Sequence, residues 1–500
     1  MPRRDVAAPG STARAPVRDR FPLLAGAIRS GATLADLVEA YTERGPSAPA
    51  VIDGGIVRSW RELRDDVLAA ARSLCGQGLR SSDAVGVTVA DHYRNLAVTL
   101  ALTRVGCAQT TLPDFEPEPA RVDLAARLGL TARIVDDGGG PVRVARVAVP
   151  AGATAGTPRP EPLCPPGTLV FTSSGTTGRA KLIPLSPHRF LVSAAQYPDP
   201  PETFYALASN QHNAPRRQLW RVLARGGTVI LGNNWPTLPL REACERYGAT
   251  HVLATGLGAL ALSAGEDSAD GPVAPAINVF LSGSRIGAAL RARVRERISP
   301  RTHVVYGAME CMPITRADPD QLDSHPDTIG TTMPEVAVEL VDDAHRPVPL
   351  GEIGAIRVRS PSATDGYLDD DTANRRAFRD GWFYPGDLAR ALTDGAYAYC
   401  GRTDDMMILD SINVFPAEIE AVAETWPGVV DCAAFARRSP IHGDIPMLAV
   451  VADRTIDRAA LLLHCRERLG LRAPRGLVVV PALPRNASGK VLRRALAGGT

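Results

Sequence analysis

The segment TSSGTTGRAK, residues 172–181, carries the most information about the fold of this chain. It follows the apolar run TLVF at 168–171, which predicts a buried strand that leads into a loop. Glycine exposes backbone amides in such a loop. Those amides and the hydroxyls can surround a polyphosphate, while Arg179 and Lys181 offset its charge. The GxxxxGK[ST] spacing of a Walker loop is absent. The alternative is a flexible Ser/Thr/Gly turn on the surface.

Short apolar runs alternate with helical patterns on both sides of this segment. AVGVTVA at 84–90 predicts a buried strand, and HYRNLAVTLALTRVG at 92–106 predicts an amphipathic helix. Further strands are predicted by four apolar runs that each end in glycine, GGTVILG (226–232), THVLATG (250–256), INVFLSG (277–283) and THVVYG (302–307). From 335 to 359 the pattern changes to alternating strands. We therefore predict an α/β fold, with a large N-terminal domain of α/β layers and a β-rich subdomain.

The last hundred residues have the pattern of a separate small domain. PAEIEAVAETW at 416–426 is the first clear helix after Gly401. We predict three parts, which are a disordered tail at 1–20, an N-terminal ATP- and substrate-binding domain at 21–402, and a mobile α+β C-terminal domain at 403–500. We find no internal repeat, which disfavours a solenoid.

The composition favours small-molecule chemistry in the cytoplasm. A hydrophobic share of 45%, a charged share of 22% and a net charge of +2 are typical of a globular protein and give no basic excess for nucleic acid. No stretch is long and apolar enough for a membrane span or a signal peptide. The 8 cysteines are scattered without CxxC spacing, which favours reduced thiols. We expect no nucleic-acid or membrane partner, and the pattern leaves the oligomeric state open.

Four later segments add polar groups next to strands and turns. Tyr306–Glu310 ends a strand with an aromatic ring that can lie against a base and a carboxylate that can hold Mg²⁺. Gly381–Asp387 places a carboxylate after a glycine turn, where it can accept hydrogen bonds from two ribose hydroxyls. Gly401–Asp405 stands at the predicted domain junction, and Pro484–Lys490 lies near the end of the chain. By itself, Asp387 is equally well explained as a residue that caps a turn.

In this order, the segments resemble the adenylate-forming superfamily that contains acyl-CoA synthetases, aryl-CoA ligases, firefly luciferase and peptide-synthetase adenylation domains. The resemblance covers about residues 30–495 and looks most like acyl- or aryl-CoA ligases. Further pieces that support it are Ser282-Gly283-Ser284, Gly351-Glu352-Ile353-Gly354, Gly366-Tyr367 and Pro416-Ala417-Glu418-Ile419-Glu420.

The resemblance implies a role for each matching residue. The phosphates of ATP would lie on a loop formed by Thr172, Ser173, Ser174, Gly175, Thr176, Thr177, Gly178 and Lys181. Nucleotide contacts would also come from Ser284, Tyr306, Gly307, Met309, Asp387 and Arg402. Within that set, Tyr306 would flank adenine and Asp387 would bind the ribose. Glu310 would hold Mg²⁺, Asp404 would be the hinge of the C-terminal domain, and Lys490 would contact the attacking oxyanion and the α-phosphate.

The sequence departs from the family pattern at several positions. Met309 stands where relatives usually have Thr or Ser, and Pro385 replaces the usual Thr. Ser411 replaces a glycine that, in CoA ligases, lies beside the pantetheine channel, and a basic residue is missing near Ile408. A CoA-dependent second half-reaction is therefore left open.

The predicted acceptor pocket at 209–218 is unusually polar. His212, Asn213 and Arg216 are its candidate lining residues, and no Asp is placed to bind an α-ammonium group. The alternative for His212 is a hydrogen-bonded structural residue, and for Arg216 and Arg217 a solvent-exposed face of a helix.

Three functions remain open at this point. The first is an AMP-forming ligase that uses ATP and Mg²⁺ to adenylate an aromatic or acyl carboxylate, releases pyrophosphate, and passes the acyl group to CoA or a carrier protein. The second is an ATP-dependent diazotase that adenylates nitrite and delivers it to an aromatic amine. The third is a catalytically inactive nucleotide-binding protein, since fold membership alone does not prove catalysis.

Overall fold

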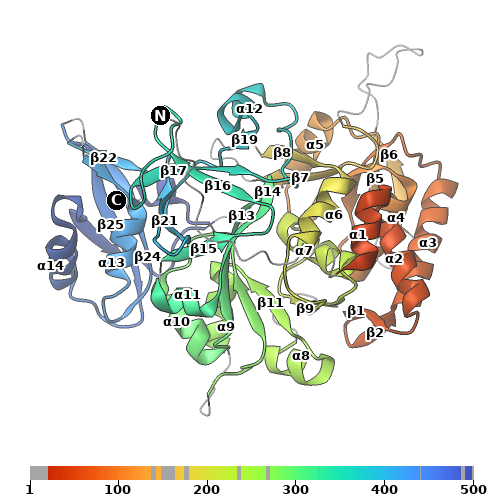
Figure 1. Cartoon of the computed structure of the whole chain (residues 1–500), viewed down its shortest axis with the longest axis horizontal. Helices are drawn as coiled ribbons and strands as arrows, with labels where there is room; N and C mark the ends of the chain where they lie inside the picture. Colours follow the sequence, from red (N-terminus) through yellow and green to blue (C-terminus); the bar gives the residue numbers. More distant parts are fainter. Residues whose placement is uncertain are drawn as a thin grey trace, which may run out of the picture.

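We describe a computed structural model of the chain for residues 21–136, 142–147, 164–173, 180–232, 238–265, 271–325, 327–410, 412–439, 441–485 and 490–497. The predicted tail at 1–20, the loop residues 174–179 and Ser411 lie outside the described residues. Figure 1 shows three groups of strands that follow one another roughly in chain order, from the red and orange N-terminal part to the blue C-terminal part.

A six-stranded sheet forms the N-terminal end of the molecule. Its order is β6-β5-β3-β4-β7-β8, with parallel pairing from β5 to β7. The strands are β3 (Ala84–Thr88), β4 (Ala108–Thr111), β5 (Ala132–Val135), β6 (Arg143–Arg146), β7 (Leu169–Ser173) and β8 (Lys181–Leu185). The strand predicted at 84–90 and the strand predicted before the glycine-hydroxyl loop are confirmed as β3 and β7. β7 and β8 pair in antiparallel, with Ser173 opposite Lys181, so the two residues on either side of the predicted phosphate-binding segment lie next to each other.

A second, fifteen-stranded sheet runs through the centre of the molecule. Its path is β18-β19-β17-β20-β21-β15-β14-β13-β12-β11-β9-β10-β1-β2, with β16 paired to β17. One part is mainly parallel and consists of β1 (Pro49–Asp53), β2 (Ile56–Ser59), β9 (Thr203–Ala206), β10 (Thr228–Leu231), β11 (His251–Ala254), β12 (Asn278–Leu281) and β13 (Thr302–Ala308). The other is antiparallel and consists of β14 (Cys311–Ala317), β15 (Thr328–Thr332), β16 (Ala337–Val341), β17 (Ile353–Arg359), β18 (Phe378–Arg379), β19 (Trp382–Phe383), β20 (Asp387–Ala391) and β21 (Tyr397–Arg402).

The antiparallel strands agree with the predicted β-rich subdomain. The four glycine-ended runs of the sequence are confirmed as β10 to β13. Each begins within two residues of its predicted start, because a buried apolar run bounded by glycine marks a strand by itself. The pairing changes from parallel to antiparallel at β13, and near the end of this strand the ring of Tyr306 lies 6.3 Å from that of Tyr399 in β21, where the candidate site lies.

A five-stranded sheet forms the C-terminal part. Its strands are β22 (Met407–Leu409), β23 (Ile412–Val414), β24 (Val429–Ser439), β25 (Gly443–Ala452) and β26 (Gly476–Val479). This sheet has hydrophobic cores of its own, one of which contains Val414, Ile419 and Leu461. The α/β fold with a large N-terminal and a smaller C-terminal part is therefore as predicted, whereas the boundary at 402/403 stays a prediction.

Helices cover the sheets. They are α1 (Pro22–Ser30), α2 (Leu34–Arg44), α3 (Trp60–Gly76), α4 (His92–Val105), α5 (Glu118–Arg127), α6 (Pro187–Ala195), α7 (Asn213–Ala224), α8 (Leu240–Tyr247), α9 (Gly256–Gly265), α10 (Ala288–Arg297), α11 (Pro319–Ser324), α12 (Asp371–Ala377), α13 (Pro416–Ala423), α14 (Arg458–Leu469) and α15 (Arg493–Ala497). The helix predicted at 92–106 is confirmed as α4, and the start of the helix predicted at 416 as that of α13. In the described part of the chain no helix is both long and apolar enough to cross a membrane.

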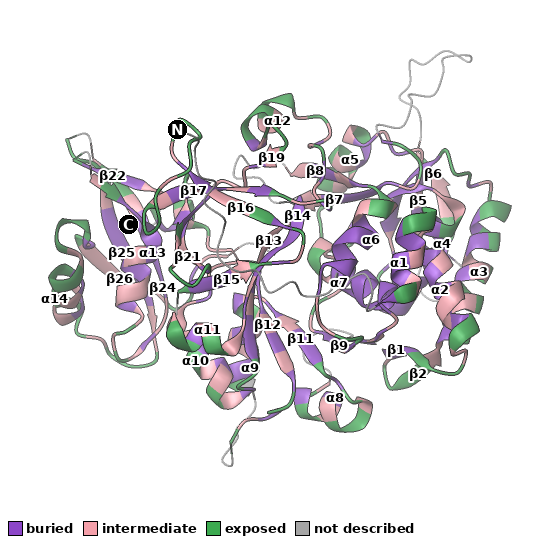
Figure 2. Cartoon of the chain, viewed as in Figure 1, coloured by how far each residue is buried: buried purple, intermediate pink, exposed green. Residues whose placement is uncertain are grey.

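Helix α7 lies in the middle of the largest core. All of its residues from Arg216 to Ala224 are buried, and it packs against α6 and α2 (Figure 2). It contains arginine at 216, 217 and 221, Arg225 follows its last residue, and all four side chains are buried. Arginine is almost never fully buried unless it is paired, so these residues need individual explanation.

Candidate functional site

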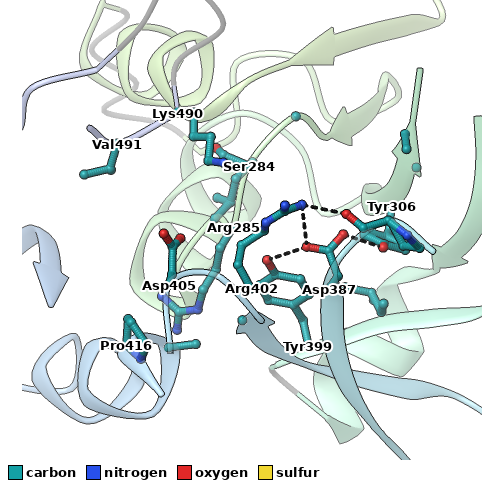
Figure 3. Close-up of a pocket in the computed structure, with 18 of the residues that line it drawn as sticks. Ser284, Arg285, Tyr306, Asp387, Tyr399, Arg402, Asp405, Pro416, Lys490 and Val491 are labelled. Atoms are coloured by element: carbon teal, nitrogen blue, oxygen red, sulfur yellow. Dashed lines mark hydrogen bonds and ion pairs between the residues drawn. The ribbon is translucent and has the colours of Figure 1, made fainter. Parts of the chain in front are cut away.

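A cavity of about 380 Å³ opens where β13, β15, β20 and β21 meet α13 and the segment that carries Lys490. Side chains from the central sheet and from the C-terminal part line it together, as the close-up in Figure 3 shows. The volume lies in the range of sites that enclose small molecules, roughly 300–1,000 Å³.

A closed hydrogen-bond network surrounds Asp387 at the start of β20. The hydroxyl of Tyr306 donates to Oδ2 at 2.7 Å, and the hydroxyl of Tyr399 donates to Oδ1 at 3.2 Å. Arg402 reaches Oδ1 at 3.4 Å and also donates to the carbonyl oxygen of Pro385 at 2.8 Å (Figure 3). Gly386 has φ +80°, and a Cβ there would lie 3.1 Å from the Arg402 guanidinium, so glycine is required before the carboxylate.

Burial dominates the protonation behaviour of this network. It raises the pKa of Asp387 above its ordinary value, although Arg402 and the two tyrosine hydroxyls favour the carboxylate. Burial and the Asp387 charge also raise the pKa of Tyr306 and Tyr399 well above the ordinary value, so both phenols remain donors. Burial alone would lower the pKa of Arg402, but Asp387 and Asp404 outweigh it and raise it. Asp404, the predicted hinge residue, accepts from Nε of Arg402 at 2.9 Å.

A second polar chain links three residues that are distant in sequence. The hydroxyl of Tyr367 donates to Oε1 of Glu310 at 2.7 Å, and Nζ of Lys181 lies 3.4 Å from the same hydroxyl. The ammonium group of Lys181 also stands 4.6 Å from the centroid of the Tyr367 ring. Burial and the Glu310 charge raise the pKa of Tyr367. The phenol therefore remains protonated and joins the carboxylate to the cation at the edge of the cavity.

Buried Arg217 holds the turn that carries Glu310. Its guanidinium donates to the carbonyl oxygens of Met309 at 2.7 Å and Met312 at 3.2 Å, and to the hydroxyl of Ser193 at 3.0 Å. Two backbone carbonyls on either side of Glu310 are therefore fixed by one side chain from α7. Burial lowers the pKa of Arg217, with Glu310 among the groups that oppose this effect.

The residues predicted to line the acceptor pocket lie at the start of α7. None of them is among the residues that line the cavity. The ring of His212 stacks on Phe115 at 4.5 Å between centroids. The amide of Asn213 donates to the carbonyl and hydroxyl oxygens of Thr172 at 2.8 and 2.7 Å, so it holds the end of β7 before the predicted phosphate loop. Their role in binding an acceptor stays a prediction.

Arg216 is fully enclosed between α7 and the neighbouring strands β4 and β7 of the six-stranded sheet. It donates to the Thr111 hydroxyl and, at 3.3 Å, to the Val170 carbonyl, and it lies 4.9 Å from the Phe171 ring centroid. Burial lowers the pKa of Arg216 to about 9, and no carboxylate in the described part of the chain opposes that effect. The alternative that Arg216 and Arg217 lie on a solvent-exposed helix face is wrong, because both are at most 3% exposed.

Lys490 reaches the cavity from the C-terminal part. It lines the same space as Ser284, and its charge acts on both Asp387 and Asp404. Figure 3 shows it next to Ser284, on the opposite side of Arg402 from Tyr306. The hydroxyl oxygen of Ser284 is buried without a hydrogen-bond partner among the described residues. Such an orphaned polar group indicates a place for a ligand atom or water.

The structure brings most of the described predicted site residues into one place. Lys181, Ser284, Tyr306, Gly307, Met309, Glu310, Asp387, Arg402 and Lys490 all line the cavity. Thr172 lies at the end of β7, the side chain of Ser173 is outside the description, and Ser174, Gly175, Thr176, Thr177 and Gly178 lie outside the described residues.

Three residues that matter to this geometry were not predicted as site residues. They are Tyr399, Arg285 and Arg217. Tyr399 precedes Arg402 by three residues in the YAYCGR strand, but alternation alone does not tell which tyrosine faces Asp387. Arg285 follows Ser284 directly, and only the fold shows that its partners lie about 140 residues later.

Two family models match the chain. The "AMP-binding enzyme" model matches residues 38–368, and the "AMP-binding enzyme C-terminal domain" model matches residues 418–490. The chain belongs to the AMP-binding enzyme family. The adenylate-forming superfamily indicated by the motifs is thereby confirmed, as is the prediction of an enzyme of the AMP-forming ligase type at the level of the family.

Curated members of the AMP-binding enzyme family are similar to the chain over different lengths. A feruloyl-CoA synthase from Amycolatopsis sp is 28% identical over 481 residues, which cover 90% of this chain and 95% of that protein. A long-chain-fatty-acid–CoA ligase from Salmonella typhimurium is 35% identical over 193 residues, 38% of this chain. The chain spans only 34% of the length of that ligase.

Solved structures of this family share the fold. An amide bond synthetase from Marinactinospora thermotolerans superposes with a TM-score of 0.78 at 24% identity, covering 93% of this chain and 99% of that one. An o-succinylbenzoate coenzyme A synthetase from Bacillus subtilis, in complex with ATP and a magnesium ion, gives 0.78 at 20% identity, covering 92% and 98%. At these identities, the likeness shows the fold of the AMP-binding enzymes and not a substrate.

Proposed function

We propose that this protein binds ATP in the cavity beneath Lys490 and adenylates an oxyanion, with a carboxylate as the favoured substrate and pyrophosphate as the leaving group. The observation that carries this proposal is the convergence on one cavity of Asp387, Glu310 and Lys490, which are separated by up to 180 residues of sequence. A structural role for each residue alone would not require this meeting.

The cavity suits the nucleoside part of ATP. The Asp387 carboxylate can accept from two ribose hydroxyls, because its oxygens are held in place by Tyr306, Tyr399 and Arg402. The unpartnered hydroxyl of Ser284 supplies a further hydrogen-bonding group at the same wall. The fixed Asp387 carboxylate, as an acceptor, and the unpartnered Ser284 hydroxyl, as a donor, suit the polar groups of a nucleoside.

The other end of the cavity suits phosphates and Mg²⁺. Among the described residues no group of three His, Cys, Asp or Glu side chains could hold a metal ion alone. Mg²⁺ is ordinarily bound by one or two carboxylates together with substrate phosphates, so a single fixed carboxylate at Glu310 fits this ion. When bound, Mg²⁺ would stabilise the charge that develops on pyrophosphate. Lys181, beside Tyr367, would offset phosphate charge.

Lys490 has the central role in the proposed reaction. An oxygen of the substrate attacks the α-phosphorus of ATP as the bond from that phosphorus to the pyrophosphate oxygen breaks. Two anions must approach each other for this step, and the Lys490 ammonium reduces their repulsion while it fixes the geometry. The products are an acyl adenylate and pyrophosphate, so charge and atoms balance without a redox partner.

The favoured acceptor of the acyl group is CoA, with a carrier protein as the alternative. The relative similar over nearly its whole length is a feruloyl-CoA synthase, which supports an aromatic acid and CoA. The amide bond synthetase among the similar folds leaves an amine acceptor as a further outcome. Ser411, which bears on the CoA step, lies outside the described residues.

The second candidate is adenylation of nitrite for diazotisation of an aromatic amine, and the buried Arg216 favours it. An enclosed guanidinium without a carboxylate partner creates positive potential near the end of β7, which suits a small anion better than a bulky apolar acid. The amine nitrogen would attack the nitrite nitrogen, AMP would leave, and loss of water from the nitrosamine would give the diazonium group.

One experiment separates these candidates. Pyrophosphate release is measured with ATP, Mg²⁺ and single oxyanions, namely a panel of aryl acids, fatty acids of graded length, and nitrite with an aminoaryl acid. We expect release with aryl acids and formation of AMP only when CoA or another acceptor is added. Pyrophosphate release with nitrite as the only active oxyanion would instead support the diazotase function.

The inactive alternative predicts ATP binding without any turnover. It is disfavoured because Lys181, Glu310, Asp387, Arg402 and Lys490 all line one cavity. With an ¹⁸O-labelled acid, label that appears in AMP identifies the acid oxygen as the nucleophile. A protein that binds ATP but releases no pyrophosphate with any oxyanion would be the inactive form.

A further inference from the structure

Arg285 connects the central sheet to the C-terminal part. It lies in the loop between β12 and α10, and its Nη1 is 2.7 Å from Oε1 of Glu424 and 3.6 Å from Oε2 of Glu420. Glu420 belongs to α13, and Glu424 is the first residue after that helix. Both carboxylates are at most 10% exposed at the side chain. This is a buried ionic contact between the two parts of the chain.

Glu424 also caps the N-terminus of α10. Its Oε2 accepts from the backbone N–H of Ala288 at 3.0 Å, the first residue of that helix. The N-terminus of a helix favours a negative charge, so the carboxylate is held by both a guanidinium and a helix end. A Cβ at Gly287 would lie 2.1 Å from Oε1 of Glu424, so only glycine leaves room for this approach.

Glu420 extends the contact towards Lys490. Its Oε1 accepts from Arg493 at 2.7 Å, and Arg493 is also 3.1 Å from Asp405. Arg493 begins α15, three residues after Lys490. One network therefore joins α10, α13, Asp405 and the segment that delivers Lys490 to the cavity.

The charges around Arg285 are unevenly divided between the two parts. From the central sheet side, Asp327 stands 3.7 Å away and Arg291 lies nearby as a like charge. Burial alone would lower the pKa of Arg285, but Glu424, Glu420 and Asp327 together raise it above the ordinary value. The guanidinium therefore remains charged, and its nearest contact, at 2.7 Å, lies in the C-terminal part.

We propose that Arg285 is a positioning residue, which binds Glu420 and Glu424 and thereby docks the C-terminal part so that Lys490 enters the cavity. This inference rests on the proposed adenylation, in which Lys490 acts. If the C-terminal part turns away for a later step, these contacts separate, so their strength sets how long Lys490 stays over the nucleotide.

The kinetic test compares variants that break the contact in different ways. Arg285→Gln removes the cation, Glu424→Gln removes one carboxylate charge, and Gly287→Ala displaces the Glu424 carboxylate without any change of charge. We expect kcat for pyrophosphate release to fall about 10-fold to 100-fold, as for loss of a charged hydrogen bond, with the KM for ATP unchanged within about twofold. Arg285→Lys is expected to restore part of kcat.

The matched control is Arg295→Gln, on α10, the helix that follows Arg285. Arg295 pairs with Asp323 at 3.0 Å through Nη2, within the N-terminal part and near solvent. We expect kcat to stay within about twofold of wild type, because exposed pairs contribute little. The double variant Arg285→Gln/Glu424→Gln should be no slower than the slower single variant. Equal losses in the control, additive losses in the double variant, or a parallel rise in the KM for ATP would overturn the proposal.

A distance measurement keeps the inference separate from the proposed reaction. Spin labels are placed at Arg346→Cys and Arg454→Cys, whose side chains are 77% and 66% exposed, after Cys75 and Cys244 are replaced by Ser. We expect one narrow distance distribution in the wild-type background and a broader one in Arg285→Gln. Broadening without pyrophosphate release from any oxyanion would retain the docking contact and refute the adenylation. An unchanged distribution in Arg285→Gln would refute the docking contact whatever the activity.

Discussion

The surroundings of Asp387 and those of Arg216 are both buried and polar, but they differ in charge balance. Asp387 has a cation and two phenol donors around it. Arg216 has only neutral acceptors, and no carboxylate in the described part of the chain moderates its pKa. The charge of the first region is offset by its own residues, whereas the second retains an uncompensated positive charge.

This contrast in charge balance predicts different contributions of the two regions to stability. A buried charge without a partner is costly, while a buried charge with several donors is tolerated. The region around Asp387 can therefore be rigid and ready for a nucleotide. We expect a bound anion to stabilise the region around Arg216. The unusual charge balance of this protein therefore lies on α7 and not around the nucleotide cavity.

The largest effect is expected at Lys490, because the proposed roles of the Asp387 and Arg216 regions both depend on the adenylation in which this residue acts. Lys490→Ala should lower the rate of pyrophosphate release about 10²-fold to 10³-fold, because one charged contact to the transition state is lost. ATP binding measured by calorimetry should change little. Arg494→Ala, an exposed residue of the adjacent helix, is the control. Full activity of Lys490→Ala would remove this residue from the mechanism.

Asp387→Asn tests the balanced region directly. The amide keeps the shape but loses the charge that holds Arg402 and accepts from ribose, so we expect ATP affinity to fall about 10-fold to 100-fold. Asp343→Asn, an exposed residue of the same subdomain, should leave ATP affinity as in wild type. Equal ATP affinity in both variants would show that the network does not bind the nucleotide.

The pH dependence of ATP binding sharpens the same point. Burial raises the pKa of Asp387, so its carboxylate is protonated at a higher pH than an ordinary aspartate. Protonation removes an acceptor, and ATP affinity should therefore weaken as the pH falls through this raised value. Asp387→Asn should lack that dependence in a titration by calorimetry. An identical pH profile in wild type and variant would exclude Asp387 as its source.

Arg217→Met tests whether α7 supports the nucleotide half. Loss of the donors to the Met309 and Met312 carbonyls should loosen the turn that carries Glu310. We expect the Mg²⁺ concentration for half-maximal pyrophosphate release to rise about 10-fold, the effect of roughly one charged hydrogen bond. Arg217→Lys should recover part of this effect. An unchanged Mg²⁺ requirement would mean that the turn holds its shape without Arg217.

Arg216→Met tests the unbalanced region and has the smallest expected effect. Removal of an unpaired buried charge should raise the free energy of unfolding by on the order of 1 kcal/mol while turnover falls. Arg221→Met on the same helix is the contrast, because Arg221 pairs with Glu202 at 2.5 Å and its loss should lower stability. Thermal unfolding measures both. A lower melting temperature for Arg216→Met would show that its hydrogen bonds outweigh its burial.

The sign of the pH effect on Arg216 follows from its lowered pKa. Burial lowers that pKa to about 9, so the folded chain binds this proton less tightly than the unfolded chain. The destabilisation is present in full below about pH 9 and is relieved as the pH rises from there towards the ordinary pKa of arginine. The stability difference between Arg216→Met and wild type should therefore be constant below about pH 9 and shrink steadily as the pH rises above about 9. A constant difference would contradict the lowered pKa.

Much of the fold could be predicted because apolar runs and glycines act locally. The strands β10 to β13 and the helix α4 were located from their own residues. The family was also recognisable, since five ordered motifs identify a chain even when each is weak. The extent of the antiparallel part and the pairing of β15 with β21 were not predictable, because pairing depends on which distant strands meet.

Residue types and the order of the motifs were enough to predict the AMP-binding family, the α/β fold and the chemistry available at Lys181, Glu310, Asp387, Arg402 and Lys490. Which neighbours those groups have became clear from the folded chain. Tyr399 reaches Asp387, Arg285 reaches Glu424, and Arg216 is enclosed without an acid. The reason is physical: residue type and spacing fix local conformation, whereas burial and charge balance depend on contacts between segments far apart in the chain.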